Sequence, residues 1–208
     1  MYLSRVELPW QAGRNPYDIH RQLWRLFPNA GQETRTCSED ERAGFLFRCE
    51  RVQPGLPVRL LVQSKNHPQP AAGVIVTAVK EFDPAPTKGQ WLRFIITANP
   101  TVTTYDAQIE RKPGKRSRTC RVPLIHEDRQ LAWLQEKLKD VARIESATAL
   151  QHPPTHFSKG KAPGKLVTVT FDGLLQVVNV EAFVKILRDG LGRGKGFGCG
   201  LMLVRRAE

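Results

Sequence analysis

Tyr17 and His20 combine residue types that could carry out acid–base chemistry on a phosphodiester. They stand three residues apart in a segment with helical spacing, so they would project from one side of a helix, with Arg21 and Arg25 further round. RNA cleavage by its own 2′-hydroxyl needs one group to take the nucleophile's proton, one to protonate the departing 5′-oxygen, and cations to stabilise the phosphorane. The pair therefore fits phosphodiester cleavage. A His–Tyr pair at this spacing is also common in purely structural roles.

A glycine-rich stretch at residues 190–200 is the second candidate for ligand contact. Its six glycines, which alternate with basic and apolar residues that include Arg193 and Lys195, are Gly190, Gly192, Gly194, Gly196, Gly198 and Gly200. Glycine lets a backbone approach a ligand closely, and bare N–H groups beside cations form an anion cradle. The stretch lacks the GK[ST] of a Walker A loop, and it follows a helix rather than a strand. It predicts contact with a phosphate-bearing polymer or close packing on the first-half helix, and a simple tight turn is the alternative.

The charge of the chain favours nucleic acid as the partner. The formal net charge is +12 over 208 residues, and 40% hydrophobic residues suffice for a core. A run without any acid, around Pro113 and Gly114, carries Arg111, Lys112, Lys115, Arg116 and Arg118. A second basic loop holds Lys159, Lys161 and Lys165. These loops predict RNA contact, with a solvated surface as the alternative.

Neither metal chemistry nor a membrane is expected. Cys37, Cys49, Cys120 and Cys199 stand far apart without a CxxC pair, and the five histidines show no HExxH spacing. We therefore expect no metal and no cofactor. No apolar run approaches the length of a membrane span and the N-terminus lacks a signal-peptide core, which predicts a cytoplasmic protein without membrane contact.

The elements that must position these residues form two similar cycles of strands and helices, the first without a regular second helix because residues 66–73 are rich in proline. The first cycle has strands at 2–8, 45–52, 58–63 and 74–80, with a helix that Asn15 caps and Pro16 opens. A proline-rich linker at 83–89 separates it from the second cycle. The second has strands at 91–98, 144–150, 166–178 and 201–204, with helices at 127–142 and 181–188. This order predicts an α+β protein of two tandem ferredoxin-like domains, residues 1–88 and 89–208, with a cleft between their sheets.

A non-catalytic RNA-recognition module is the rival interpretation. Residues 195–198 match the opening of the RNP1 pattern, but Cys199 stands where that pattern has its next aromatic residue. RNP1 lies on an interior strand that is followed by a helix and a strand, whereas only eight residues follow Gly200. The placement therefore disfavours RNP1, while a generic binder of structured RNA stays open.

Several segments, in the same order along the chain, resemble the CasE family, the CRISPR-associated endoribonuclease of the type I-E Cascade complex. They are residues 1–4, the helix 17–28, RFIITANP at 93–100, CRVPLI at 120–125 and the glycine-rich stretch. The last of these fits the family's pair of Gly-hydrophobic-Gly triplets, here 190–192 and 198–200.

The resemblance implies tandem ferredoxin-like, RRM-like domains that bind the stem-loop of the CRISPR repeat, together with other Cascade subunits as partners. It implies metal-independent cleavage of precursor CRISPR RNA at the 3′ base of the stem, a 2′,3′-cyclic phosphate, and retention of the product. The family's catalytic histidine corresponds to His20 and its tyrosine to Tyr17, with Arg25 nearest to the family's lysine. The groove-entering basic loop corresponds to residues 111–118. The repeat sequence and the acid and base roles within the pair are left open.

Overall fold

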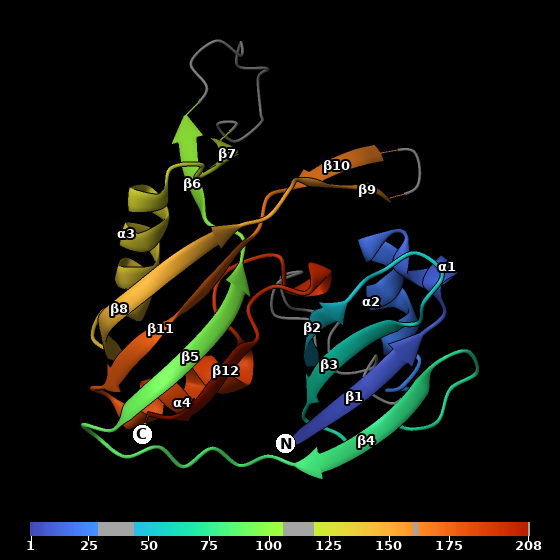
Figure 1. Cartoon of the computed structure of the whole chain (residues 1–208), viewed down its shortest axis with the longest axis horizontal. Coiled ribbons are helices and arrows are strands. Elements are labelled where there is room, and N and C mark those ends of the chain that lie inside the picture. Colours follow the sequence, from blue (N-terminus) through green and yellow to red (C-terminus); the bar gives the residue numbers. More distant parts are fainter. Residues whose placement is uncertain (29–43, 106–118, 160–161, 208) are drawn as a thin grey trace, which may run out of the picture.

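The chain forms two four-stranded antiparallel sheets, one from each half of the sequence (Figure 1). This computed structural model describes residues 1–28, 44–105, 119–159 and 162–207. The first sheet has the strand order β2-β3-β1-β4 and the second the order β12-β5-β11-β8. Both sheets have the antiparallel arrangement of a ferredoxin-like unit, in which the first strand of each half lies in the interior of its sheet.

The first half is built from a central strand and one long helix. Its elements are β1 (Tyr2–Leu8), α1 (Trp10–Gly13), α2 (Pro16–Trp24), β2 (Phe45–Arg51), β3 (Val58–Ser64) and β4 (Ile75–Glu81). Alternation in β1 buries Val6 and Leu8, which pack with Ile19 and Leu23 of α2. Residues 65–74 form no helix, so α2 is the longer of the two described helices of this half.

The second half has both helices of the unit packed on its sheet. Its elements are β5 (Trp91–Ala98), β6 (Thr101–Tyr105), β7 (Thr119–Pro123), α3 (Glu127–Leu138), β8 (Ala142–Gln151), β9 (Thr155–Lys159), β10 (Ala162–Leu166), β11 (Val169–Val177), α4 (Val180–Asp189), η1 (Lys195–Phe197) and β12 (Met202–Arg206). Leu134 and Leu138 of α3 and Phe183 of α4 share one core with Phe94 and Phe171 of the sheet. The hairpins β6–β7 and β9–β10 extend from one end of this half (Figure 1).

The two halves contact each other through apolar side chains and one buried amide. Leu46 and Leu61 of the first sheet pack with Leu201, just before β12. Gln63 Nε2 donates to the backbone oxygen of Leu187 at 2.7 Å, near the end of α4. A buried amide without a partner would cost free energy, so this bond favours one fixed docking of α4 on the first sheet.

The predicted α+β, tandem ferredoxin-like fold is confirmed, with corrections to individual elements. The helix expected over 127–142 ends at Leu138, because Lys139 is extended and Asp140 adopts φ 61°, a left-handed conformation that aspartate tolerates. Leu166 belongs to the hairpin strand β10 rather than to a strand over 166–178, and β11 begins at Val169. The hairpins themselves were not predicted. The division between residues 88 and 89 stays a prediction; β4 ends at Glu81 and β5 begins at Trp91.

Candidate active site

Helix α2 presents His20 to the second half of the chain. The helix begins as expected, since the Asn15 side chain accepts a hydrogen bond from the backbone N–H of Tyr17 at 3.3 Å and Pro16 occupies the first turn. Ile19 and Leu23 are buried against the sheet. His20 lies beside this apolar stripe and is half-buried.

The His20 imidazole is enclosed by three aromatic rings. Ring centroids lie at 5.9 Å for Trp24, 5.4 Å for Phe45 and 6.3 Å for Phe47, the last nearly parallel at 23°. The turn η1 covers another side, where a Cβ placed on Gly196 would lie 3.6 Å from the imidazole. Trp24 is on α2 and the two phenylalanines are on β2, so the first half supplies the rings and the second half supplies a backbone cover.

The Nε2 atom of His20 is buried and has no hydrogen-bond partner among the described residues. Burial lowers the pKa of His20 below its ordinary value of 6.5, because an apolar enclosure disfavours the charged imidazolium. The ring is therefore neutral at pH 7 and can carry its proton on Nδ1, which leaves Nε2 as an acceptor. A substrate hydroxyl can reach Nε2 only after a neighbouring side chain moves, a rearrangement common when a catalytic site closes on its substrate.

The glycine-rich stretch packs on this enclosure more than it opens toward a ligand. Backbone carbonyls accept the N–H groups of Gly190, Leu191, Phe197, Gly198, Cys199 and Gly200. The expected cradle of bare N–H groups is therefore wrong for these six. Close packing on the first half, the other expectation, is what the geometry supports.

Gly198 shows why the stretch needs glycine. Its φ is +84°, a left-handed conformation that side chains rarely adopt, and an added Cβ would lie 3.2 Å from the Phe47 ring. The residue that follows η1 thus lies close to the same phenylalanine that stacks on His20.

The β9–β10 hairpin reaches α2 from the opposite half. Asn15 Nδ2 donates to the backbone oxygen of Ser158 at 3.1 Å. The Phe157 ring lies 4.4 Å from that of Phe197 in η1, and a Cβ at Gly164 would overlap the Phe157 ring. The hairpin therefore contacts both the start of α2 and the turn that covers His20.

Comparison with known proteins assigns this architecture to a family. Residues 1–206 match the family described as CRISPR associated protein. A protein of Escherichia coli K12 named CRISPR system Cascade subunit CasE is 35% identical over 202 residues, which cover 97% of this chain and 98% of that protein. The chain belongs to the CasE family of CRISPR-associated proteins.

Further relatives agree over nearly the whole length. The CRISPR-associated endoribonuclease Cse3 of Thermus thermophilus is 32% identical over 207 residues, 91% of this chain and 90% of that protein. The crystal structure of Cas6e from E. coli K-12 matches with a TM-score of 0.83 at 33% identity and covers 100% of both chains. The structure of T. thermophilus Cse3 bound to an RNA representing a pre-cleavage complex matches with a TM-score of 0.72 at 27% identity, covering 99% of this chain and 100% of that one.

The structure places the other predicted residues of this CasE-family chain unevenly. Tyr17 is half-buried one turn before His20. Arg25 is exposed at the end of α2 and donates to Gln22 Oε1 at 2.9 Å, and no described contact brings it to His20. Arg21 pairs with Asp18 at 3.0 Å on the exposed surface.

The remaining basic residues flank the site without contacting His20 in the described part of the chain. Arg193 is exposed, Lys195 is half-buried at the start of η1, and Lys165 is exposed on β10. Lys159 ends β9, whereas Lys161 and residues 111–118 lie outside the described residues. The latter join β6 to β7, and their RNA contacts stay a prediction.

Sequence reasoning missed the aromatic enclosure and the hairpin contact. Phe45 and Phe47 alternate along β2. This spacing indicates a buried strand face but does not show which residue packs against it. Trp24 four residues after His20 was the one local signal of a ring contact. Phe157 gave none, because its partner Phe197 is distant in sequence.

Metal and membrane features are absent from the described part of the chain. No group of three or more His, Cys, Asp and Glu residues comes together there. Burial raises the pKa of the Cys199 thiol to about 12, so this thiol is not a nucleophile at neutral pH. No described helix is both long and apolar enough to cross a membrane.

Proposed function

We propose that this protein is a metal-independent endoribonuclease that binds the stem-loop of the CRISPR repeat and cuts precursor CRISPR RNA at the 3′ base of the stem. The observation that carries the proposal is the buried Nε2 of His20 at the junction of the two halves, which has no partner among the described residues. Relatives named as an endoribonuclease and as a Cascade subunit support it.

The proposed reaction is an internal transesterification. The 2′-hydroxyl of the nucleotide 5′ of the scissile phosphate loses its proton and attacks phosphorus, and the 5′-oxygen of the next nucleotide leaves with a proton. The products are a 2′,3′-cyclic phosphate and a 5′-hydroxyl. The nucleophile belongs to the RNA, so the reaction needs no metal to generate one.

We assign proton acceptance to His20, because an imidazole kept neutral by burial, with its pKa lowered, is suited to act as a base. Tyr17, one turn away, is the second group of the pair and donates a proton or orients the substrate. Arg25 is the proposed source of positive charge at the phosphorane. That role requires its guanidinium to leave Gln22 when RNA binds.

The stem contacts survive the cut, so the product hairpin is expected to stay bound. Retention suits a subunit that carries mature CRISPR RNA into a larger complex, and we propose other Cascade subunits as protein partners on the strength of the CasE relative. We also propose that the protein acts in the cytoplasm, where the precursor transcript is made.

The test is single-turnover cleavage of the cognate repeat hairpin in EDTA. His20→Ala should lower the rate by about 10²–10⁴ while binding changes little, because loss of a general base typically costs that much. A 2′-deoxy nucleotide 5′ of the scissile phosphate should abolish cleavage. Unaltered cleavage by His20→Ala, or cleavage of the deoxy RNA, would overturn the mechanism.

A structured-RNA-binding protein without catalysis is the second candidate. The same burial of Nε2 favours it, since a histidine packed among aromatic rings also stabilises a core. Tight binding of the ribonucleotide hairpin with no cleavage, in both wild type and His20→Ala, would establish this alternative.

A further inference from the structure

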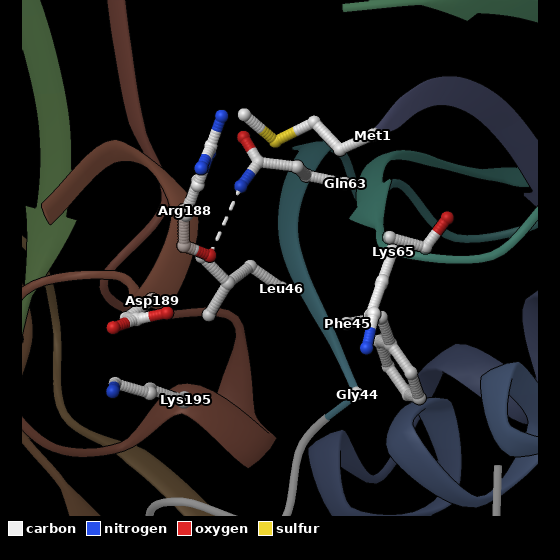
Figure 2. A pocket seen from close by; sticks show the side chains of 10 residues that line it. Met1, Gly44, Phe45, Leu46, Gln63, Lys65, Arg188, Asp189 and Lys195 are labelled. Atoms are coloured by element: carbon white, nitrogen blue, oxygen red, sulfur yellow. Dashed lines mark hydrogen bonds between the residues drawn. The ribbon is translucent and has the colours of Figure 1, made fainter. Parts of the chain in front are cut away.

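A cavity of about 670 Å³ lies between the two halves and shares Phe45 with the enclosure of His20. Phe45, Leu46 and Lys65 line it from the first half, and Asp189 and Lys195 from the second (Figure 2). Its volume is within the range of pockets that hold small ligands. A mononucleotide unit is of a size to enter it.

The base of the cavity is rigid. Gln63 Nε2 donates to the backbone oxygen of Arg188 at 3.3 Å as well as to that of Leu187, which ties β3 to the end of α4 (Figure 2). Leu46 is buried in the apolar contact between the halves. The cavity is therefore a fixed feature of the interface and offers an apolar floor to a base.

The lining of the cavity carries three cations and one carboxylate. Lys65 and Lys195 stand on opposite sides, with Asp189 beside Lys195, and the Arg188 side chain points away from Asp189 (Figure 2). Arg188 also pairs with Asp83 at 3.5 Å, so the two lysines are the better candidates for an incoming anion. An apolar floor with cations on two sides matches a base and its phosphate.

Two residues make the cavity continuous with the catalytic enclosure. Phe45 is both a wall of the cavity and a neighbour of His20, with ring centroids 5.4 Å apart. Lys195 begins η1, whose next residue, Gly196, covers the imidazole. A nucleotide in the cavity would thus be separated from His20 by the Phe45 ring, which suits the nucleotide next to the scissile phosphate.

The direction of the RNA follows from the proposed cut. The nucleotide 5′ of the scissile phosphate is the last nucleotide of the stem and is base-paired, so it cannot enter a cavity. Both hairpins of the second half lie at the other end of the molecule from the N-terminus, whose Met1 also lines the cavity (Figure 1). This proposal therefore places the stem on the hairpin side of His20.

Resting on the proposed function, we propose that this cavity binds the unpaired nucleotide directly 3′ of the scissile phosphate. Leu46 and Phe45 contact its base, and Lys65 and Lys195 hold the phosphate that follows it. The cavity thereby positions the nucleotide that carries the departing 5′-oxygen, and it accepts only an unpaired nucleotide, which fixes the cut at the end of the stem.

The test compares binding of RNAs that differ only in the presence and position of one neutral phosphate analogue. All carry a 2′-deoxy sugar 5′ of the scissile phosphate, so that binding is read without cleavage. The first has the natural 3′ extension, and the second has a neutral methylphosphonate in place of the phosphate after the first 3′ nucleotide. A third carries the methylphosphonate in the 5′ flank of the stem. The proteins are wild type, Lys65→Gln and the matched control Lys88→Gln, an exposed lysine of the linker.

Loss of one charged contact to phosphate should weaken binding about tenfold. Lys65→Gln should therefore bind the natural extension about tenfold more weakly than wild type, yet bind the 3′ methylphosphonate RNA with little change, because partners in one contact are not additive. Lys88→Gln should match wild type on every RNA. The 5′-flank substitution should leave the effect of Lys65→Gln intact.

The subsite would be overturned if Lys65→Gln weakened binding of the natural RNA and of the 3′ methylphosphonate RNA equally, or weakened binding of neither. Loss of the Lys65→Gln effect with the 5′-flank RNA would assign the cavity to the other strand and equally refute the proposal. Cleavage of the all-ribose hairpin by wild type is measured separately. If that cleavage fails, the proposed function falls, whereas the binding comparison still decides the subsite.

Discussion

Gly198→Ala tests whether the glycine-rich turn holds the enclosure of His20 in shape. The backbone at this position has φ +84°, and a left-handed conformation costs an alanine about 1–2 kcal/mol. The new methyl would also lie 3.2 Å from the Phe47 ring, which must shift by a few tenths of an ångström. Together these costs predict a loss of about 1–3 kcal/mol in the free energy of unfolding.

The matched control lies two residues earlier in the same turn. A Cβ on Gly196 would be 3.6 Å from the His20 ring, an ordinary van der Waals contact, and Gly196 is not among the glycines with positive φ. Gly196→Ala should therefore fold nearly as well as wild type. It lacks both the backbone strain and the close approach to Phe47 of Gly198→Ala, so the comparison measures these two costs together.

Thermal unfolding and single-turnover cleavage are the two measurements. A loss of about 1 kcal/mol lowers the melting temperature of a chain of this length by about 2–4 °C, so Gly198→Ala should melt roughly 2–12 °C below wild type. Its cleavage rate should fall even at temperatures where it is folded, because Phe47 stacks on His20. Melting of Gly198→Ala at the wild-type temperature, or an equal loss in Gly196→Ala, would refute the reasoning.

Three further predictions address proton transfer by His20, the role of the β9–β10 hairpin, and RNA binding by the basic loop. The cleavage rate should be constant near pH 7 and fall in acid as His20 takes a proton. Because the pKa of His20 in the folded chain lies below 6.5, the unfolded chain binds this proton first, so the stability that His20 contributes should be complete above about pH 6.5 and decline below it. His20→Gln should reduce that decline in melting temperatures measured over a pH series. Phe157→Ala should lower the maximal cleavage rate by up to about tenfold, with a smaller effect on RNA binding, since the aromatic pair with Phe197 contributes about 0.5–1.5 kcal/mol. Phe157→Leu should recover part of the rate. Equal losses in cleavage rate and RNA affinity would contradict a positioning role for Phe157. The last variant neutralises four cations of the basic loop, Arg111, Lys112, Lys115 and Arg116. The slope of log K for RNA binding against log salt concentration should become shallower by a few units at most, and RNA affinity should fall more than the cleavage rate of bound RNA. An unchanged slope in a salt titration would show that the loop is a solvated surface.

The features that sequence predicted correctly depend on neighbours along the chain. Asn15 followed by Pro16 specifies the start of α2 through one side-chain hydrogen bond and one preset φ, both local effects. Alternation in β1 and β5 fixes which face of each sheet is buried. The βαββαβ order of the second half, which the first half follows except for its second helix, then leaves few ways to arrange the strands. The tandem ferredoxin-like fold followed from those signals.

The features that sequence missed depend on contacts between distant segments. A glycine-rich stretch is compatible with an anion cradle or with close packing. Its backbone hydrogen bonds and its closeness to Phe47 and Leu46, both set by distant segments, decide between them. The helix boundary at Leu138 turned on Asp140, whose left-handed conformation no hydrophobic periodicity reports. The lowered pKa of His20 likewise depends on its enclosure by side chains of β2. No sequence motif connects β2 with the pair Tyr17 and His20.

The arrangement makes both halves parts of the proposed active site. The first half supplies His20, Tyr17 and the aromatic rings, while the second supplies the turn that covers the imidazole and the hairpin that holds Asn15. Without the second half, the faces of Leu46 and Leu61 would be open to water, and the buried environment that lowers the pKa of His20 would lose one side. The docking that Gln63 anchors to α4 therefore sets both the stability of the interface and the protonation state of the proposed base. An isolated first half should thus hold His20 with a pKa closer to its ordinary value and lack the cavity beside it, so that neither the base nor the leaving strand would be in place.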